Sequence, residues 1–282
     1  MSVMNDQKIY AGIVTYNPDL TRLNENISAV YPQADKLIIV DNGSDNYAEI
    51  CELIKQFPNV CMIHNHKNQG IAKALNQIME TAKAENANWV LSLDQDSVIS
   101  DSLIAHYRPY LDTPGLGMLT CILKDRNTTG FTAKDLNGEC EEVQRCITSG
   151  CLTSLEAWEN VGRYDEKMFI DYVDYDLCMS LREHGYKIMR VNTEGILHEL
   201  GHSKDVRFNG KDTVVFNHSP MRKYHIVRNR LYYTRKHASI VNTRLEYKGI
   251  LKYVLTALIY EDNKISNLGA MIRGAVDSLK MR

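Results

Sequence analysis

The fold of this chain is best predicted from the stretch Trp89-Val90-Leu91-Ser92-Leu93-Asp94-Gln95-Asp96-Ser97. Its first five residues form an apolar run of the kind found in buried strands. Asp94 and Asp96 follow at positions i and i+2, so both carboxylates leave a continuing strand on the same side. Carboxylates at a strand end suit Mg²⁺ or Mn²⁺ carrying a phosphorylated substrate, although Asp is also common in ordinary turns. The rest of the sequence decides between these two interpretations.

Three more strand patterns precede this one, and each is followed by a helical pattern. We predict strands at 9–14, 37–40 and 60–63, and helices at 20–30, 50–57 and 70–79. This alternation predicts an α/β fold, with a mostly parallel, Rossmann-like sheet flanked by helices on both faces. Sheets of this kind bind ligands at the carboxyl ends of their strands.

The second half of the chain is less regular. We predict strands at 118–123, 146–154, 187–191 and 196–197, a polar loop at 124–138, and a helix at 174–183 that ends at Gly185. Residues 203–217 are polar and poorly patterned, and predict a loop. The remaining segments are helical in pattern, at 221–237, 246–260 and 264–280. We therefore expect a helical extension after the sheet.

The composition is that of an ordinary soluble globule, with 282 residues, 44% apolar and 24% charged. No apolar run reaches the length that crosses a bilayer, and no signal peptide is recognisable. The seven cysteines are odd in number, scattered, and without a C-x-x-C pair. This pattern favours reduced thiols in a cytoplasm over a disulfide framework or a structural zinc site.

The net charge of −2 conceals an asymmetry between the two ends of the chain. Residues 220–282 hold 13 of the 33 Lys and Arg but only 4 of the 35 Asp and Glu, a surplus of nine positive charges. The rest of the chain has a surplus of eleven negative charges. A basic tail indicates either an anionic partner, such as a membrane surface or nucleic acid, or simply solvated helix faces.

Polar side chains gather where each of the first four predicted strands ends. They are Thr15, Tyr16 and Asn17, then Asp41 and Asn42, then Asn68 and Gln69, and finally Asp94 and Asp96. Each one alone would be a turn former, but together an aromatic ring and several Asn and Asp side chains predict a nucleotide pocket. Neither a dinucleotide-binding glycine motif nor a P-loop is present. A diphosphate would then need a cation, for which Asp96 offers the place.

A second polar cluster lies in the run from Phe169 to Cys178. Asp174 stands where a helix begins, so it is either a helix cap or a general base that Phe169, Tyr172 and Tyr175 partly desolvate. Asp171 and Asp176 are its neighbours, and Asp176 is open to pairing with a basic residue. The sequence alone leaves these alternatives open.

His198 and His202 form the ends of a formal H-E-x-x-H pattern. Gly201 interrupts the helix that a zinc protease would need there, and no third ligand is evident. We therefore disfavour a zinc protease.

The order of these motifs resembles the inverting family 2 glycosyltransferases with the GT-A fold. The matching segments are Val14-Thr15-Tyr16-Asn17, Val40-Asp41-Asn42-Gly43-Ser44, Asn68-Gln69-Gly70-Ile71-Ala72 and Asp94-Gln95-Asp96-Ser97. The acceptor half of that family is matched by Ser149-Gly150-Cys151, 169–177, Arg182 and Gly185-Tyr186. Within the family the chain is most similar to bacterial rhamnosyltransferases of surface polysaccharide assembly, through His198-Glu199-Leu200-Gly201, Arg222-Lys223-Tyr224 and Arg228-Asn229-Arg230.

The resemblance implies a role for each matching residue. It implies nucleotide binding by Thr15, Tyr16, Asn17, Asp41, Asn42, Asn68, Lys73 and Asp94, with Asp94 on the ribose or sugar. It implies that Asp96 and His198 hold Mg²⁺ or Mn²⁺ and that Asp174 is the catalytic base. Val173 stands where the family has Glu, which is a departure from the pattern. Acceptor or phosphate contacts are implied for Gly150, Asp171, Arg228 and Asn229.

The implied function is transfer of L-rhamnose from dTDP-rhamnose to a hydroxyl of a growing, lipid-linked bacterial surface polysaccharide. Asp174 would deprotonate the acceptor, and one displacement would invert the anomeric carbon. The alternatives are a donor such as UDP-Gal, UDP-Glc or UDP-GlcNAc, or a non-catalytic nucleotide- or glycan-binding module. Residues 1–219 would form the GT-A domain, with 1–100 as nucleotide-binding half and 101–219 as acceptor half.

The basic extension, 220–282, carries an apolar stripe beside Lys248 and Lys252. Its members are Tyr247, Ile250, Leu251, Val254, Leu255 and Leu258. Such a stripe predicts packing on the domain, a homodimer, or peripheral contact with the inner face of the cytoplasmic membrane. The resemblance implies no nucleic-acid partner.

Overall fold

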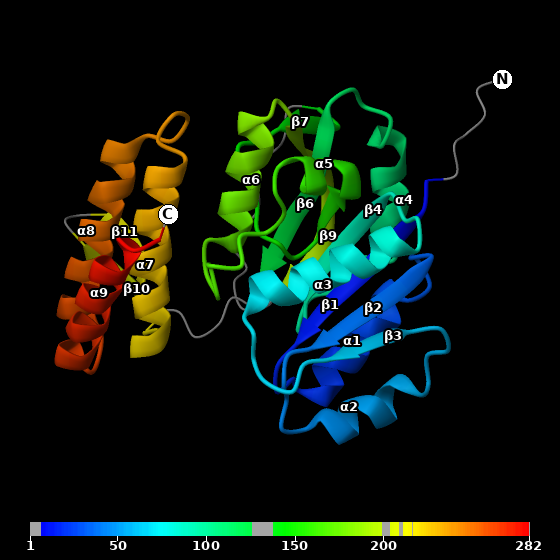
Figure 1. The fold of residues 1–282 in the computed structure, drawn as a ribbon, viewed down its shortest axis with the longest axis horizontal. Helices are drawn as coiled ribbons and strands as arrows, with labels where there is room; N and C mark the ends of the chain where they lie inside the picture. Colours follow the sequence, from blue (N-terminus) through cyan, green and yellow to red (C-terminus); the bar gives the residue numbers. More distant parts are fainter. Residues whose placement is uncertain (1–6, 126–137, 199–203, 209–210, 216, 282) are drawn as a thin grey trace.

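The structure is a computed structural model that describes residues 7–125, 138–198, 204–208, 211–215 and 217–281. A nine-stranded sheet is flanked by helices on both faces, and a group of C-terminal helices stands beside it (Figure 1). The α/β fold predicted from the sequence is therefore confirmed.

Four parallel strands form the first half of the sheet, and helices connect them. The strands are β1 (Ile9–Thr15), β2 (Lys36–Asp41), β3 (Cys61–His64) and β4 (Trp89–Asp94), and the helices are α1 (Leu20–Val30), α2 (Tyr47–Ile54) and α3 (Ile71–Ala84). Strand β1 lies between β2 and β4 and is buried along its whole length. Its unbroken apolar run is what a strand covered on both faces requires.

The second half of the sheet is mixed in direction, and the full order is β3-β2-β1-β4-β8-β6-β9-β5, with β7 paired to β9. These strands are β5 (Val98–Ile99), β6 (Leu116–Asp125), β7 (Cys140–Glu142), β8 (Cys151–Ser154) and β9 (Lys187–His198). Strand β8 is antiparallel to both β4 and β6, whereas β6 and β9 are parallel. The helical elements here are α4 (Leu103–Tyr107), the 3₁₀ turn η1 (Arg108–Tyr110), α5 (Leu155–Asn160) and α6 (Val173–Glu183).

Three predictions for the second half were wrong. The strand predicted from residue 146 begins only at Cys151, because Gly150 has a φ of +80° that ends extended pairing before it. The two strands predicted at 187–191 and 196–197 form the single strand β9, whose register to β6 shifts along the way. The loop predicted at 203–217 contains the antiparallel pair β10 (Lys204–Phe208) and β11 (Lys211–Val215). The loop predicted at 124–138 falls mostly outside the described residues.

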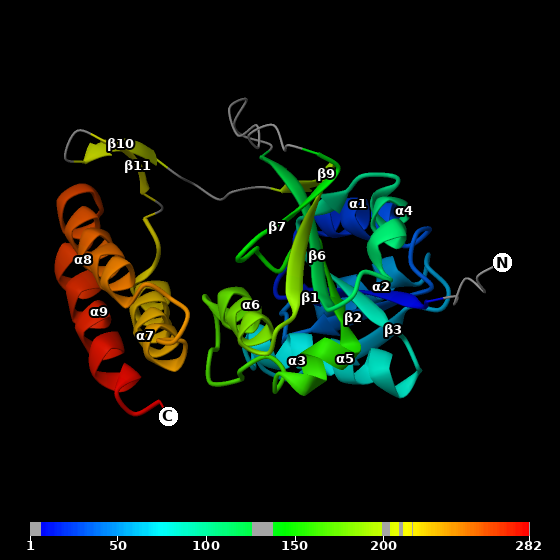
Figure 2. The ribbon, with the colours of Figure 1, turned by 90° about the horizontal axis from the view of Figure 1, so that it is seen from above.

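The hydrophobic core has two layers, one on each face of the sheet. On one face Ile13 of β1 packs with Leu23 and Ile27 of α1. On the other face α3 lies close to the sheet, since a Cβ on Gly12 would stand 2.4 Å from the Ile78 side chain. Figure 2 shows α1 and α4 on one side and α3, α5 and α6 on the other. The two layers leave the carboxyl ends of the strands as the open edge.

The C-terminal extension consists of α7 (Pro220–Lys236), α8 (Thr243–Tyr260) and α9 (Lys264–Ser278). A small core of Val227, Ala257 and Met271 joins the three helices. Helix α7 lies nearest the sheet domain, and α8 and α9 are outermost (Figure 2). Among the described residues, no helix combines the length and the apolar character needed to cross a membrane.

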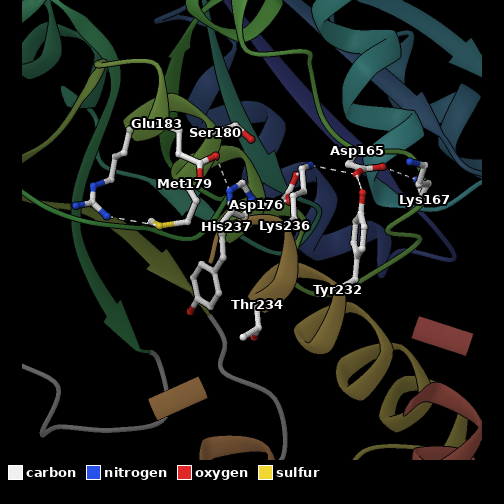
Figure 3. A network of polar contacts seen from close by, with 12 residues as sticks. Asp165, Lys167, Asp176, Met179, Ser180, Glu183, Tyr232, Thr234, Lys236 and His237 are labelled. Atoms are coloured by element: carbon white, nitrogen blue, oxygen red, sulfur yellow. Dashed lines mark hydrogen bonds and ion pairs between the residues drawn. The ribbon is translucent and has the colours of Figure 1, made fainter. Parts of the chain in front are cut away.

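A network of ion pairs and hydrogen bonds, buried at Asp176 and His237, joins the end of α7 to the sheet domain (Figure 3). Asp176 of α6 is 1% exposed and accepts a hydrogen bond from Lys236 Nζ at 2.7 Å, which confirms that it pairs with a basic residue. His237 lies between two carboxylates, with Nε2 2.9 Å from Asp176 and Nδ1 2.8 Å from Glu183. Lys236 also reaches Asp165 at 3.1 Å. These charges compensate one another across the junction, so the extension is held by more than apolar contact.

The cysteines carry free thiols throughout the chain. Three of them lie close together beside α6. Cys146 Sγ is 3.1 Å from Cys151 Sγ and 3.8 Å from Sγ of Cys178, which belongs to α6. Hydrogen bonding with the thiols of Cys151 and Cys178, together with burial, raises the pKa of Cys146 well above its ordinary value. A buried thiol with a raised pKa is a weak nucleophile, so this cluster acts as core packing.

Candidate active site

The carboxyl ends of β1, β2, β3 and β4 are joined by hydrogen bonds into one rim. The N–H of Asn42 donates to Thr15 O at 2.7 Å, and the N–H of Asn65 donates to Asp41 O at 2.8 Å. The N–H of Tyr16 donates to the Gln95 side chain at 2.8 Å, which ties the end of β1 to the end of β4. The polar residues predicted at four separate strand ends therefore share one edge of the sheet.

Asp41 organises the loop that follows β2. Its carboxylate accepts the Thr15 hydroxyl at 3.1 Å, the N–H groups of Gly43 and Ser44 at 3.1 Å each, and the Ser44 hydroxyl. His64 Nδ1 lies 3.0 Å from the same carboxylate. Asp41 and Thr15 are both 0% exposed. Neither side chain reaches the surface here, so their expected contact with the nucleotide stays a prediction that would require the loop to open.

Asn42 has a similar structural role. Its Nδ2 donates to Asn68 Oδ1 at 3.0 Å and to Gly70 O at 3.2 Å. Its Oδ1 accepts from Asn65 Nδ2 at 3.2 Å and from the N–H of Gln69 at 3.0 Å. All hydrogen-bonding groups of the buried Asn42 amide are thus used within the loop. Asn42 holds the start of α3 against the end of β2, and Asn68 caps the same connection.

Tyr16 is the aromatic side chain that this rim presents to solvent, with 47% of its surface exposed. Its neighbour Asn17 has a φ of 47°, and the N–H of Asn17 donates to Ser44 Oγ at 2.8 Å. The Asn17 side chain accepts the N–H of Asp45 at 2.7 Å. The backbone under Tyr16 is therefore fixed while its ring stays accessible, which suits stacking on a base.

Asp94 and Asp96 are half-buried at the end of β4. Asp94 is held through its backbone, since its N–H donates to Ser149 Oγ at 3.1 Å and its carbonyl accepts Asn26 Nδ2 at 2.6 Å. No group of three or more metal-binding side chains occurs among the described residues. Mg²⁺, however, is usually bound by one or two carboxylates together with substrate phosphates and water, so these two carboxylates fit such an ion.

Two further predicted residues stand near this rim. Lys73 lies in the first turn of α3, where its Nζ is 3.2 Å from Glu166 Oε1. The pair is partly exposed, so Lys73 lies at the surface of the site with a carboxylate partner. His198 ends β9, and its side chain lies outside the described residues.

Asp174 lies in the first turn of α6, and its Oδ1 accepts the N–H of Tyr175 at 2.8 Å. Burial raises the pKa of Asp174 to about 7. The N–H of Tyr175 opposes this shift, whereas the charges of Asp94 and Asp171 reinforce it. A carboxyl with this pKa can take a proton from a hydroxyl near neutral pH. The N-cap of α6 is Tyr172 and no side chain caps it, so the cap interpretation of Asp174 is wrong, and the general-base role stays a prediction.

Asp174 lines a cavity of about 450 Å³ between α6 and the C-terminal extension. Tyr172 and Tyr175 line the same cavity and their rings meet edge to face. Phe169, which we expected beside them, instead stacks on His225 of α7 with ring centroids 5.3 Å apart. A larger cleft of about 680 Å³ surrounds Trp89 at the amino end of β4 and holds none of the predicted site residues. Of these two, the cavity at Asp174 is therefore the one that contains the predicted base.

Gly150 does not contact an acceptor, contrary to expectation. It is buried with a φ of +80°, and a Cβ there would stand 2.4 Å from the Ile196 side chain. Its N–H donates to Ser92 O at 2.8 Å, and its carbonyl accepts the Tyr107 hydroxyl at 2.7 Å. Both backbone groups are thus occupied. Gly150 allows the neighbouring Ser149 to approach β4.

Asn229 is also corrected, because it shapes the loop before α6, whereas Arg228 is only partly buried and its expected contact stays a prediction. Asn229 is 0% exposed, and its Nδ2 donates to Ile170 O at 2.8 Å and Asp171 O at 2.9 Å. Arg228 donates to Asn229 Oδ1 at 2.9 Å and to Lys167 O at 2.8 Å. A buried amide with two carbonyl partners has no route to a phosphate. The pair instead holds the left-handed turn at Asp171 and Tyr172.

Asp171 does reach the cavity, together with a basic partner. Arg222 binds its carboxylate through Nε at 3.2 Å and Nη2 at 3.1 Å. Burial raises the pKa of Asp171, and the Arg222 charge opposes the rise. The ion pair is partly exposed on the Arg222 side, so it offers a polar edge to a ligand in the cavity.

Several residues of this cavity were not predicted from the sequence. They are His218, Arg222, Ile226, Tyr253, Thr256 and Glu261. Burial and the charges of Arg222 and Lys223 lower the pKa of His218 to about 4, so it is neutral at pH 7. Arg222 belongs to a motif noted in the sequence, but nothing local to α8 indicates that Tyr253 and Glu261 face Asp174. Only the packing of the extension brings them there.

Comparison with known proteins agrees with the predicted fold and family. The model of glycosyl transferase family 2 matches residues 10–168. The dTDP-rhamnosyl transferase RfbF of Shigella flexneri is 28% identical over 290 residues, which cover 98% of this chain and 96% of the relative. The poly-beta-1,6-N-acetyl-D-glucosamine synthase of Staphylococcus epidermidis is 28% identical over 57% of this chain and 41% of its own length.

Solved structures share the arrangement at low sequence identity. S. aureus TarS 1-349 in complex with UDP-GlcNAc has a TM-score of 0.62 at 14% identity, over 97% of this chain and 81% of that one. GalNAc-T7 with UDP, GalNAc and Mn²⁺ has a TM-score of 0.65 at 13% identity, over 98% and 56% of the two chains. The expected GT-A fold is therefore confirmed. The family model matches more than half of the chain, so the chain belongs to glycosyl transferase family 2.

Proposed function

We propose that this protein transfers L-rhamnose from dTDP-rhamnose to a hydroxyl of a growing, lipid-linked surface polysaccharide, with inversion at the anomeric carbon. The observation that carries the proposal is the position of Asp174, a carboxyl with a pKa of about 7 on the wall of a 450 Å³ cavity. Similarity to a dTDP-rhamnosyl transferase along nearly the whole of both chains supports the choice of donor.

In the proposed reaction Asp174 accepts the proton of the acceptor hydroxyl. The hydroxyl oxygen attacks the anomeric carbon, and the bond to the nucleoside diphosphate breaks on the opposite face. This single displacement inverts the configuration and needs no nucleophile from the enzyme. Tyr172 and Tyr175 line the cavity around the base and limit access of water, which would otherwise compete as acceptor.

The donor would lie along the rim of the strand ends. Tyr16 would stack on the base, Asp94 would contact the ribose or sugar, and Lys73 would lie at the edge of the donor site. Asp96 would hold a divalent cation, with His198 as the second expected ligand. When bound, Mg²⁺ or Mn²⁺ would neutralise charge on the departing diphosphate.

The acceptor would enter the cavity formed with the extension. The Asp171–Arg222 ion pair and Glu261 give this cavity polar edges that suit sugar hydroxyls. A lipid-linked acceptor would place the enzyme in the cytoplasm, at the inner face of the cytoplasmic membrane. This location is part of the proposal.

A panel of nucleotide sugars tests the proposal. With Mg²⁺ or Mn²⁺ present, dTDP-rhamnose should be hydrolysed or transferred faster than UDP-Gal, UDP-Glc or UDP-GlcNAc. Asp96→Asn, or a chelator, should slow the reaction roughly 100-fold because charge on the leaving group is no longer neutralised. The matched variant Asp101→Asn, an exposed carboxylate further along the chain, should keep the wild-type rate.

The same panel separates the alternatives. Preference for a UDP-sugar would replace the rhamnose assignment with another hexosyltransferase. Donor binding without hydrolysis or transfer, under every condition of metal and acceptor, would indicate a non-catalytic binding module.

The rate should depend on pH in the direction set by Asp174. A base must be deprotonated to act, and the pKa of Asp174 is raised to about 7. We therefore expect kcat/KM to rise with pH, to be half-maximal near pH 7, and to level off above it. An activity profile that is flat between pH 5 and pH 8 would rule out Asp174 as the base.

A further inference from the structure

Exposed large apolar side chains are concentrated on the C-terminal extension. Of the thirteen such side chains in the described part of the molecule, twelve belong to 220–282 and the other is Tyr16. Soluble monomeric proteins rarely leave a large contiguous apolar patch uncovered. The extension therefore has a surface that fits a partner.

Eight of these twelve side chains fall into two stripes, one on α8 and one on α9. The α8 stripe is Tyr247, Leu251, Leu255 and Ile259, and the α9 stripe is Ile265, Ile272, Val276 and Leu279. The spacing of three, four or seven residues places the members of each stripe on one side of its helix. Of the stripe predicted from the sequence, Ile250, Val254 and Leu258 are partly buried, and only Tyr247, Leu251 and Leu255 face solvent.

The two stripes lie on the outer side of the extension. Helices α8 and α9 are the outermost helices, and α7 lies nearer the sheet domain (Figures 1 and 2). On α8 the opposite side points inward, because Tyr253 and Thr256 line the cavity at Asp174. A helix is about 10 Å across, so the outer face and the acceptor cavity are separated by a single helix.

Charge on this outer face is almost entirely positive. Its exposed basic residues are Arg244, Lys248, Lys252, Lys264, Arg273 and Lys280. Among the described residues, Arg244, Lys248, Lys252 and Arg273 make no ion pair. The acids of the same helices are occupied, since Glu246 pairs with Arg230 and Asp277 pairs with Lys280.

Positive charge decides between the possible occupants of the face. A second copy docked by this surface would bring two basic faces together, which costs energy unless anions intervene. An anionic lipid surface complements both features, because phosphates attract Lys and Arg while the apolar side chains enter the headgroup boundary. Tyr247 and Tyr260 are residue types favoured at that boundary.

We propose that the outer faces of α8 and α9 dock the enzyme on an anionic lipid bilayer, without crossing it. The inference deepens the proposed function, since a docked enzyme would hold its acceptor cavity one helix away from the surface that carries a lipid-linked glycan. The same helix, α8, would contact lipid on one side and acceptor on the other.

Sedimentation of the full chain with vesicles tests this docking. The protein should bind vesicles of phosphatidylcholine mixed with phosphatidylglycerol, and should bind pure phosphatidylcholine far more weakly. The triple variant Arg244→Ser/Lys248→Ser/Lys252→Ser should lose roughly 100-fold in partitioning, because each basic residue near an anionic surface strengthens binding about fivefold. The variant Ile265→Asn/Ile272→Asn should also weaken binding, at unchanged charge.

Matched controls show whether the effect belongs to this face. The variant Lys8→Ser/Lys55→Ser/Lys187→Ser removes three exposed basic residues from the sheet domain and should bind vesicles like the wild type. If both triple variants lost the same amount of vesicle binding, net charge alone would explain the binding, and the proposal would be overturned. A dimer in light scattering that the Ile265→Asn/Ile272→Asn variant abolishes, with no vesicle binding, would assign the face to a second copy instead.

Donor hydrolysis without membranes keeps this proposal separate from the proposed function. The Arg244→Ser/Lys248→Ser/Lys252→Ser variant should hydrolyse or bind the donor like the wild type, since none of the three residues lines the site. Vesicle binding by an enzyme that accepts no nucleotide sugar would reject the function and keep the docking. An active enzyme that ignores anionic vesicles would reject only the docking.

Discussion

Replacing Asp174 by Asn is expected to reduce sugar transfer about 1000-fold while leaving donor affinity within a factor of a few. The amide has the shape of the carboxyl but cannot accept the hydroxyl proton. The donor is expected along the strand ends, away from this side chain. Initial rates of transfer, together with calorimetric titration of the donor, measure the two effects. Loss of donor binding in parallel with the rate would show that Asp174 positions the donor instead.

The same substitution should raise stability at high pH. The pKa of Asp174 rises from 3.8 to about 7 on folding, so the folded state binds the proton more tightly than the unfolded state. Stability is therefore lost as pH rises from about 4 to about 7, by on the order of 4 kcal/mol. Asn carries no such charge, so Asp174→Asn should melt at higher temperature than the wild type at pH 8. Near pH 4 the difference should vanish, and a variant less stable at both pH values would contradict the buried-charge argument.

Replacing Asp41 by Ala is expected to lower the free energy of unfolding by about 3 kcal/mol and to weaken donor binding with it. The substitution leaves two backbone N–H groups and two hydroxyls without their shared acceptor. The loop from Gly43 to Asp45 also supports Asn17, so its disorder would release Tyr16. Chemical denaturation and donor titration on the same samples measure both losses.

Asp45→Ala is the matched control for Asp41, since it is an exposed carboxylate in the same loop. Its effect on stability should stay within about 0.5 kcal/mol. If Asp41→Ala weakened donor binding with no change in unfolding, Asp41 would contact the nucleotide directly. The loop that covers Asp41 would then have to open when the nucleotide binds.

The sequence predicted which edge of the sheet carries the candidate site. It did not predict which of the polar residues there are exposed and which are buried in the loops. Strand ends are marked by apolar runs that stop at Thr15, Asp41 and Asp94, and parallel strands bring such ends to one edge. Whether a given polar residue faces the ligand or the loop depends on how many donors converge on it. Asp41 and Tyr16 look equally suitable in the sequence, yet one is sealed by hydrogen bonds and the other exposed.

Contacts between distant parts of the chain were the least predictable. Asn229 follows the loop at Asp171 by more than fifty residues, and the sequence around it reads as an ordinary basic helix. The acceptor-site roles expected for Gly150 and Asn229 were wrong for the same reason, since a motif gives residue types but not their exposure. The pair β10 and β11 was missed because two short polar strands carry little apolar signal.

The ion network between α6 and α7 has a consequence for how this enzyme can change over generations. Asp165, Asp176 and Glu183 lie in the sheet domain, and their partners Lys236 and His237 lie in the extension. If recombination exchanged only the last sixty residues, the buried carboxylate of Asp176 would lose its partners in the extension. These five positions therefore have to be inherited together, and the rest of the extension can vary only if they are kept.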